Sequence, residues 1–155
     1  MRIGIYNICK NEIKHIDQWF EPLKTADVIC ILDTGSTDGS YEKWQELAQQ
    51  YPNLHIQQKI YNPFYFDDAR NDALDFIKTF LTEEDVVFHL DLDETAQSNF
   101  IQEAREQCNT NAEIFLVHDA TGGVTWKGHR LLSYLRWNYH IHEKIIDIRK
   151  TNQNE

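Results

Sequence analysis

Two mainly apolar runs, VICIL at 28–32 and VVFHL at 86–90, limit the fold of this chain more than any other feature. A continuous apolar run indicates a strand that is buried on both faces, because a half-exposed strand alternates apolar with polar residues. Both runs end abruptly, the first in DTGSTDGS and the second in acidic residues. The pattern predicts a sheet that is covered by helices on both faces and has polar loops at its strand ends.

Apolar residues recur at helical spacing in the stretches beside these two strands. The expected helices cover Ile13 to Leu23, Tyr41 to Tyr51 and Ala69 to Phe80, with a fourth at 98–107. Pro63 interrupts the preceding pattern of residues. Asp67 follows it and is the expected N-cap of the third helix.

Further strands are expected at 2–8, 54–56 and 114–117, and strands with loops over 123–148. Strands that alternate with helices indicate βαβ units and a mostly parallel sheet of the α/β class. The 155 residues suffice for one small domain. Trp126, Trp137 and Tyr139 in the irregular part could stack on a sugar, although such aromatic residues more often serve in packing.

The charge and the cysteines exclude several classes of protein. A net charge of -10 disfavours binding to nucleic acid or to an anionic membrane, since both depend on Lys and Arg. The three cysteines form no CxxC pair, and Cys30 lies in an apolar run, which indicates a core residue. The sequence shows no signal-peptide pattern and no apolar stretch of transmembrane length, so a cytoplasmic location is expected.

Polar residues should gather where the parallel strands end. Ligands of open α/β sheets bind at the carboxyl ends of the strands, so we expect Asn7, Asp33 and Asp91 to Glu94 at one rim. If the backbone stays extended, Asp91 and Asp93 point the same way and repel each other unless a cation lies between them. Two carboxylates at an open site suit Mg²⁺ or Mn²⁺, although a polar strand-end loop explains the same residues.

Asp33 and Arg70 are weaker candidates from the residues alone. The turn after 28–32 does not require Asp33, which could accept a hydrogen bond from a base or a ribose. Arg70 could pair with a diphosphate or with Asp33, but spacing alone favours an ordinary ion pair with Asp67 or Asp68. The loop is not a phosphate-binding P-loop, because the GxxxxGK[ST] spacing is missing.

Five motifs in order resemble family 2 glycosyltransferases, which have the GT-A fold. They are CKNEIKHIDQWFEPL, ILDTGSTDGS, DDARNDAL, FHLDLDE and RWNYHIHEKI, and the resemblance covers the chain from about residue 3 to 148. The nearest likeness is to bacterial members whose catalytic domain is often followed by tetratricopeptide repeats. The resemblance implies a glycosyltransferase domain at 1–150 and leaves 151–155 as a polar C-terminal tail.

The resemblance also implies roles for individual residues. Asn7 and Asp33 match positions that hold the nucleoside, and Arg70 matches a position near the diphosphate. Asp91 matches the first acid of the DXD motif, near ribose and metal, and Asp93 matches the acid that coordinates Mn²⁺ or Mg²⁺. In the HE pair, His142 would be a further metal ligand and Glu143 the catalytic base.

The HE pair raises a geometric question. His140 and His142 would share a face on a regular strand, so spacing alone allows a two-histidine metal site, whereas the resemblance singles out His142. Glu143 would then point elsewhere, and its role as base requires a bend or a bulge.

The function implied is metal-dependent, inverting transfer of a sugar from a nucleotide-sugar, with a UDP-hexose as the commonest donor. The acceptor could be a glycan, a lipid or a protein. Only a dozen residues follow HE, and Thr34 replaces a second Asp of many relatives, so a partner chain or a homodimer could complete the acceptor side. The alternatives are an inactive nucleotide-sugar-binding module and a nucleotidyltransferase, whose Gly-rich loop the CKNE segment lacks.

Overall fold

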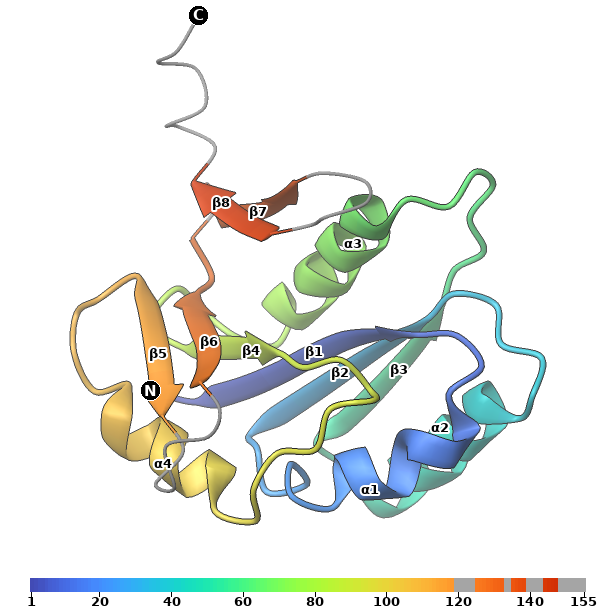
Figure 1. Ribbon diagram of the computed structural model, residues 1–155, viewed down its shortest axis with the longest axis horizontal. Helices are drawn as coiled ribbons and strands as arrows, with labels where there is room; N and C mark the ends of the chain where they lie inside the picture. The colour runs from blue at the N-terminus through green and yellow to red at the C-terminus, as the bar shows by residue number, and fades with distance from the viewer. Residues whose placement is uncertain (119–124, 133–134, 139–143, 148–155) are drawn as a thin grey trace, which may run out of the picture.

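The computed structural model describes residues 1–118, 125–132, 135–138 and 144–147. Within these residues, six strands form one sheet in the order β3-β2-β1-β4-β6-β5 (Figure 1). Their bounds are Ile3–Cys9 for β1, Val28–Asp33 for β2, Leu54–Gln58 for β3, Val86–His89 for β4, Ile114–His118 for β5 and Thr125–Arg130 for β6. A separate hairpin pairs β7, Leu135–Asn138, with β8, Lys144–Asp147.

The four strands from β3 to β4 run parallel, which confirms the mostly parallel sheet. Only β6 runs in the opposite direction among the described strands of this sheet, and β5 pairs antiparallel with β6. Cys9 is the register partner of Asp33, and Tyr6 is the partner of His89. The carboxyl ends of β1, β2 and β4 therefore meet at one rim, as the sequence predicted.

Helices cover both faces of the sheet. Figure 1 shows α3, Phe66–Lys78, and the β7–β8 hairpin on one face, and α1, Ile16–Phe20, α2, Ser40–Gln50, and α4, Phe100–Gln107, on the other. Each face has its own buried apolar cluster, one with the side chains of α3 and one with those of α1, α2 and α4. Cys30 is fully buried, as expected. Among the described residues, no helix combines the length and the apolar character that crossing a bilayer requires.

Two local predictions differ from the structure. The helix expected from Ile13 is a 3-10 turn, Ile13–His15, followed by the short α1. The helix α3 begins at Phe66 with Tyr65 as its N-cap, so the prediction that Asp67 caps it was wrong. Asp67 instead lies in the first turn, where a carboxylate is favoured by the positive end of the helix dipole.

Gly128 allows β6 to lie close against β4, so we expect Gly128→Ala to destabilise the fold. A Cβ at this position would lie 2.6 Å from two ring atoms of Phe88, whose side chain is fully buried and packs on Phe100. Overpacking of this kind costs about 1–3 kcal/mol, which urea unfolding measures. The neighbouring Lys127→Ala serves as control, with an expected change within about 0.5 kcal/mol. Equal urea midpoints for Gly128→Ala and wild type would contradict the prediction.

Candidate functional site

A pocket of about 470 Å³ opens at the carboxyl-end rim, a size typical of ligand sites. It is lined by residues from the ends of β1, β2 and β4 and from the start of α3: Asn7, Ile8, Cys9, Lys10, Glu12, Thr34, Phe64, Phe66, Arg70, Asp91, Leu92 and Asp93. The fold thus brings four of the predicted site residues, Asn7, Arg70, Asp91 and Asp93, to one cavity.

The LDLDE segment forms a turn, so the condition of an extended backbone at Asp91 and Asp93 is not met. Strand β4 ends at His89, and the backbone N–H of Glu94 donates to the carbonyl of Asp91 at 3.0 Å. The Glu94 carboxylate accepts from the Asp91 N–H at 2.8 Å and closes the turn from the other side. The two aspartates face the pocket because of this turn, and strand alternation plays no part.

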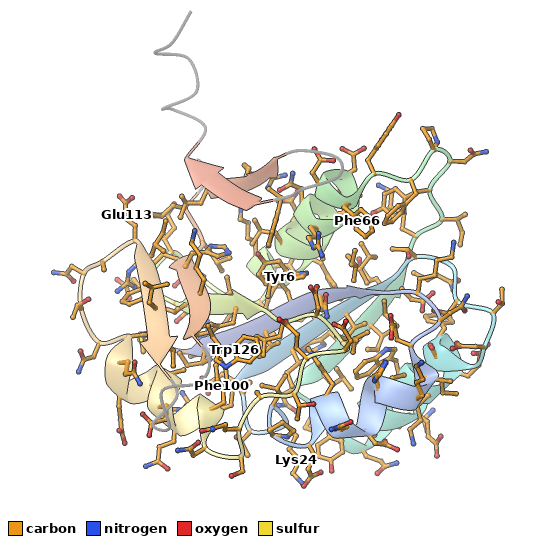
Figure 2. All side chains as sticks on the ribbon, in the orientation of Figure 1. Tyr6, Lys24, Phe66, Phe100, Glu113 and Trp126 are labelled. Carbon is orange, nitrogen blue, oxygen red and sulfur yellow. The ribbon has the colours of Figure 1, made fainter. Side chains whose placement is uncertain are left out.

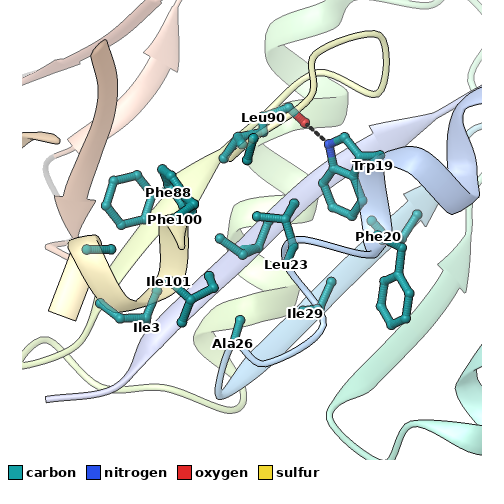
Figure 3. Close-up of a cluster of buried hydrophobic side chains, with 14 of the residues drawn as sticks. Ile3, Trp19, Phe20, Leu23, Ala26, Ile29, Phe88, Leu90, Phe100 and Ile101 are labelled. Carbon is teal, nitrogen blue, oxygen red and sulfur yellow. Dashed lines mark hydrogen bonds between the residues drawn. The ribbon is translucent and has the colours of Figure 1, made fainter. Parts of the chain in front are cut away.

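The carbonyl of Leu90 fixes where the turn begins. It accepts a hydrogen bond from the Asn7 side-chain amide. It accepts another, at 3.1 Å, from the indole N–H of Trp19, as Figure 3 shows. Asn7 belongs to β1 and Trp19 to α1, and both side chains are buried. Asn7 therefore lines the pocket and also holds the acidic turn in place.

Arg70 is a buried cation directed at this turn. Its Nη2 donates to Asp91 Oδ1 at 3.2 Å, with 8% of the Arg70 side chain exposed against 51% of the Asp91 side chain. Its Nε donates to Nε2 of His89 at 3.2 Å, and its Cζ lies 5.3 Å from the ring centre of Phe66. Burial lowers the pKa of Arg70, and the nearby Asp91 carboxylate raises it. A guanidinium held at a pocket wall beside a carboxylate suits recognition of a phosphate group.

His89 is neutral and contacts both Arg70 and Asp91. Burial, together with the neighbouring Arg70, holds the pKa of His89 well below its usual value. Because Nε2 accepts from Arg70, the proton of the neutral ring lies on Nδ1, 3.8 Å from Asp91 Oδ1. The sequence offered one indication of this role, namely a polar residue inside the apolar run 86–90.

Asp33 lies at the tip of β2 but is turned into the loop that follows. Its carboxylate is fully buried and accepts from the backbone N–H groups of Gly35 and Ser36, each at 2.9 Å, from the Ser36 hydroxyl and from the Gln58 amide. The adjacent Thr34 lines the pocket. In the described structure Asp33 thus shapes the wall of the pocket through the 33–40 loop.

Asp91 and Asp93 are the residues of the acidic turn that could hold a divalent cation. Asp91 and Asp93 supply hard oxygen ligands at an open site, and burial together with these two carboxylates raises the pKa of Glu94. In the part of the chain that the structure describes, no three His, Cys, Asp or Glu side chains gather closely enough to hold a metal by themselves. Mg²⁺ commonly binds one or two carboxylates plus substrate phosphates, so this donor set is consistent with such a site.

His142 and Glu143 lie outside the described residues, so the metal-ligand role expected of His142 and the base role expected of Glu143 stay predictions.

Phe64 and Phe66, which the sequence did not single out, form an aromatic wall of the pocket with their ring centres 4.9 Å apart. Figure 2 shows Phe66 at the start of α3. Their position between Pro63 and Asp67, the N-cap expected from the sequence, was the available indication.

Comparison with known proteins identifies a family and a fold. The sequence model described as "Glycosyl transferase family 2" matches residues 7–154. No curated protein matches this chain. The crystal structure of S. aureus TarS 1-349 superposes with a TM-score of 0.60 at 21% identity, covering 74% of this chain and 34% of that one.

Two further solved structures agree with the first. TarS 1-349 in complex with UDP gives a TM-score of 0.59 at 21% identity, again covering 74% of this chain and 34% of that one. S. aureus TarS itself gives 0.57 at 22% identity and covers 70% of this chain and 20% of that one. This chain spans about a third of the length of the TarS 1-349 structures. At this identity the likeness shows the fold, which is the expected GT-A architecture.

Proposed function

This chain belongs to glycosyl transferase family 2, and from that membership we propose that its rim pocket binds a nucleotide-sugar and transfers the sugar to an acceptor. The observation that carries the proposal is the convergence of Arg70, Asp91 and Asp93 on one pocket at the carboxyl ends of parallel strands. A cation and a carboxylate pair at one site suit a diphosphate that arrives with a divalent metal. UDP is the proposed nucleotide, supported by the UDP complex of the similarly folded TarS.

Different residues of the pocket would bind different parts of the nucleotide-sugar. Departure of the diphosphate places negative charge on its oxygens, and the Arg70 guanidinium would stabilise that charge. Asp93 and Asp91 would hold Mn²⁺ or Mg²⁺, whose chemistry is to stabilise the same leaving group. The ends of β1 and β2, with Asn7 and Thr34, would contact the nucleoside.

The acceptor side rests on the family resemblance. We propose an inverting reaction in which Glu143 removes the proton of the acceptor hydroxyl and His142 completes the metal site. The acceptor, a homodimer that completes its site, and a cytoplasmic location stay predictions. So does the domain boundary at residue 150, because residues 148–155 lie outside the described part of the chain.

A titration followed by a turnover assay tests the proposal. UDP is titrated by calorimetry with Mn²⁺ and again with EDTA, and UDP release from UDP-hexoses is then followed with varied acceptors. We expect binding that strengthens with Mn²⁺ and release of UDP. Metal-dependent binding without release under any condition would favour the inactive binding module. Lack of UDP binding would contradict the proposed donor site.

Arg70→Lys is expected to weaken UDP binding while leaving uridine binding unchanged. Lysine keeps the charge but lacks the planar fork that contacts Asp91 and His89 together. Loss of one charge-assisted hydrogen bond, worth about 1.5–3 kcal/mol, corresponds to a rise in Kd of about 10-fold or more. Arg105→Lys is the matched control, because Arg105 pairs with Asp27 before β2, at the opposite end of the sheet from the pocket. An unchanged UDP affinity in Arg70→Lys would remove Arg70 from diphosphate recognition.

A further inference from the structure

Strand β7 is attached to helix α3 by a side chain that imitates a neighbouring strand. The Asn71 amide Nδ2 donates to the carbonyl of Trp137 at 3.0 Å, and its Oδ1 accepts from the Trp137 N–H at 2.9 Å. One residue earlier in β7, Arg136 makes a two-pronged ion pair with Asp75 at 2.5 and 3.2 Å. These contacts fix the position and the orientation of the Trp137 backbone relative to helix α3.

The indole N–H of Trp137 begins a buried chain of hydrogen bonds. It donates to the Tyr6 hydroxyl at 2.8 Å, and that hydroxyl lies 2.9 Å from Nε2 of His129. The other ring nitrogen of His129 lies 2.9 Å from the carbonyl of Arg130, which can only accept, so Nε2 accepts from Tyr6. Tyr6 and His129 are buried, and every donor in this series of hydrogen bonds has an acceptor. The indole of Trp137 is thus tied to β1 and β6 as well as to α3.

The ring of Trp137 touches the groups that direct Asp91. The Arg70 Cζ lies 5.2 Å from its ring centre, and the ring of His89 meets it edge-on at 5.0 Å and 62°. Arg70 donates to both His89 and Asp91, so one indole contacts the guanidinium that holds the Asp91 carboxylate and the imidazole that accepts from that guanidinium. Phe66 holds the guanidinium from a second ring at 5.3 Å.

From these contacts we infer that Trp137, held by Asn71, is a positioning residue that keeps Arg70 aimed at the diphosphate half of the donor pocket. The inference rests on the proposed function and deepens it. An arginine side chain has many rotamers, and binding is stronger when few of them must be lost. The indole limits the rotamers of Arg70 and keeps water from His89. Its loss should therefore weaken contacts to the diphosphate and spare those to the nucleoside.

The test compares the affinities for UDP and UMP, both measured with Mn²⁺, in wild type and in three variants. Trp137→Ala removes the indole, and the UDP preference over UMP should fall by about 3- to 30-fold, the range of a cation–π contact. Trp137→Phe keeps a ring against Arg70 and should recover most of the preference. Trp126→Ala is the matched control, because Trp126 lies on the other face of the sheet, where it packs on Phe100 (Figure 2). That control should lose stability but keep the preference.

The outcomes separate this inference from the proposed function. If wild type prefers UDP and Trp137→Ala keeps the same preference, the inference is overturned and the donor site stands. If wild type binds neither nucleotide, the donor site is overturned and this inference with it. Should Trp137→Ala fail to fold by circular dichroism, Asn71→Ala decides instead, since it removes the clamp and leaves Arg70 and the indole intact. An unchanged UDP preference in a folded Asn71→Ala would then overturn the inference.

Discussion

Replacing Asp93 by Ala should reduce the affinity for UDP in Mn²⁺ to the value measured in EDTA. Asp93 lies in the acidic turn, is exposed and lines the pocket. Asp91 already shares its charge with Arg70, whereas Asp93 has no ion-pair partner among the described residues. The carboxylate with the most charge available to a cation is therefore that of Asp93. Because the loss of an outer-shell partner alone costs about 10–100-fold in metal affinity, loss of a direct ligand should cost about 100-fold or more.

The control for this experiment is another exposed aspartate, Asp17→Ala, on α1 and outside the residues that line the pocket. It changes the net charge equally, so a general electrostatic effect on UDP would appear in both variants. The Mn²⁺-dependent gain should be lost in Asp93→Ala only. A gain of equal size in both variants would remove Asp93 from the metal shell.

Glu143→Gln should lower turnover by about 10²–10⁴-fold and leave UDP affinity close to that of wild type. This range is the usual contribution of a positioned general base, and Gln keeps the size of the side chain but cannot accept the proton. Glu143 lies outside the described residues, and the prediction comes from the family resemblance. Single-turnover release of UDP in the presence of an acceptor, measured beside calorimetry, separates chemistry from binding.

Glu106→Gln, on α4, is the matched control for Glu143→Gln and should retain normal turnover. Near-normal turnover of Glu143→Gln would leave the base unassigned and direct attention to other carboxylates. Loss of UDP binding together with turnover would instead point to a role in the donor pocket.

The elements that periodicity defines were predicted well from the sequence. Continuous apolar runs located β2 and β4, helical spacing located α2 and α3, and the rule for open α/β sheets placed Asn7 and Asp91 at one rim. These features follow from which faces of an element are buried, and a single sequence contains that information.

Features that depend on contacts distant in the sequence could not be predicted. Asn71 and Trp137 are separated by 66 positions, and Tyr6 and His129 by 123, so no local pattern joins them. The turn at residues 91–94 could not be predicted for a related reason. Strand alternation at Asp93 presumes a continuing strand, and β4 ends at His89 once its pairing with β1 ends.

Through the carbonyl of Leu90, ligand binding at the pocket is coupled to the stability of the whole domain against unfolding. Its two donors come from the interior of β1 and from α1, so the turn that would grip a ligand is anchored in the core. A ligand that binds only the native state raises the free energy of unfolding, by about 2.7 kcal/mol at 100 times its Kd. Melting of the entire domain would thus report binding at the rim, and a thermal-shift screen of nucleotides and sugars could identify the donor without any knowledge of the acceptor.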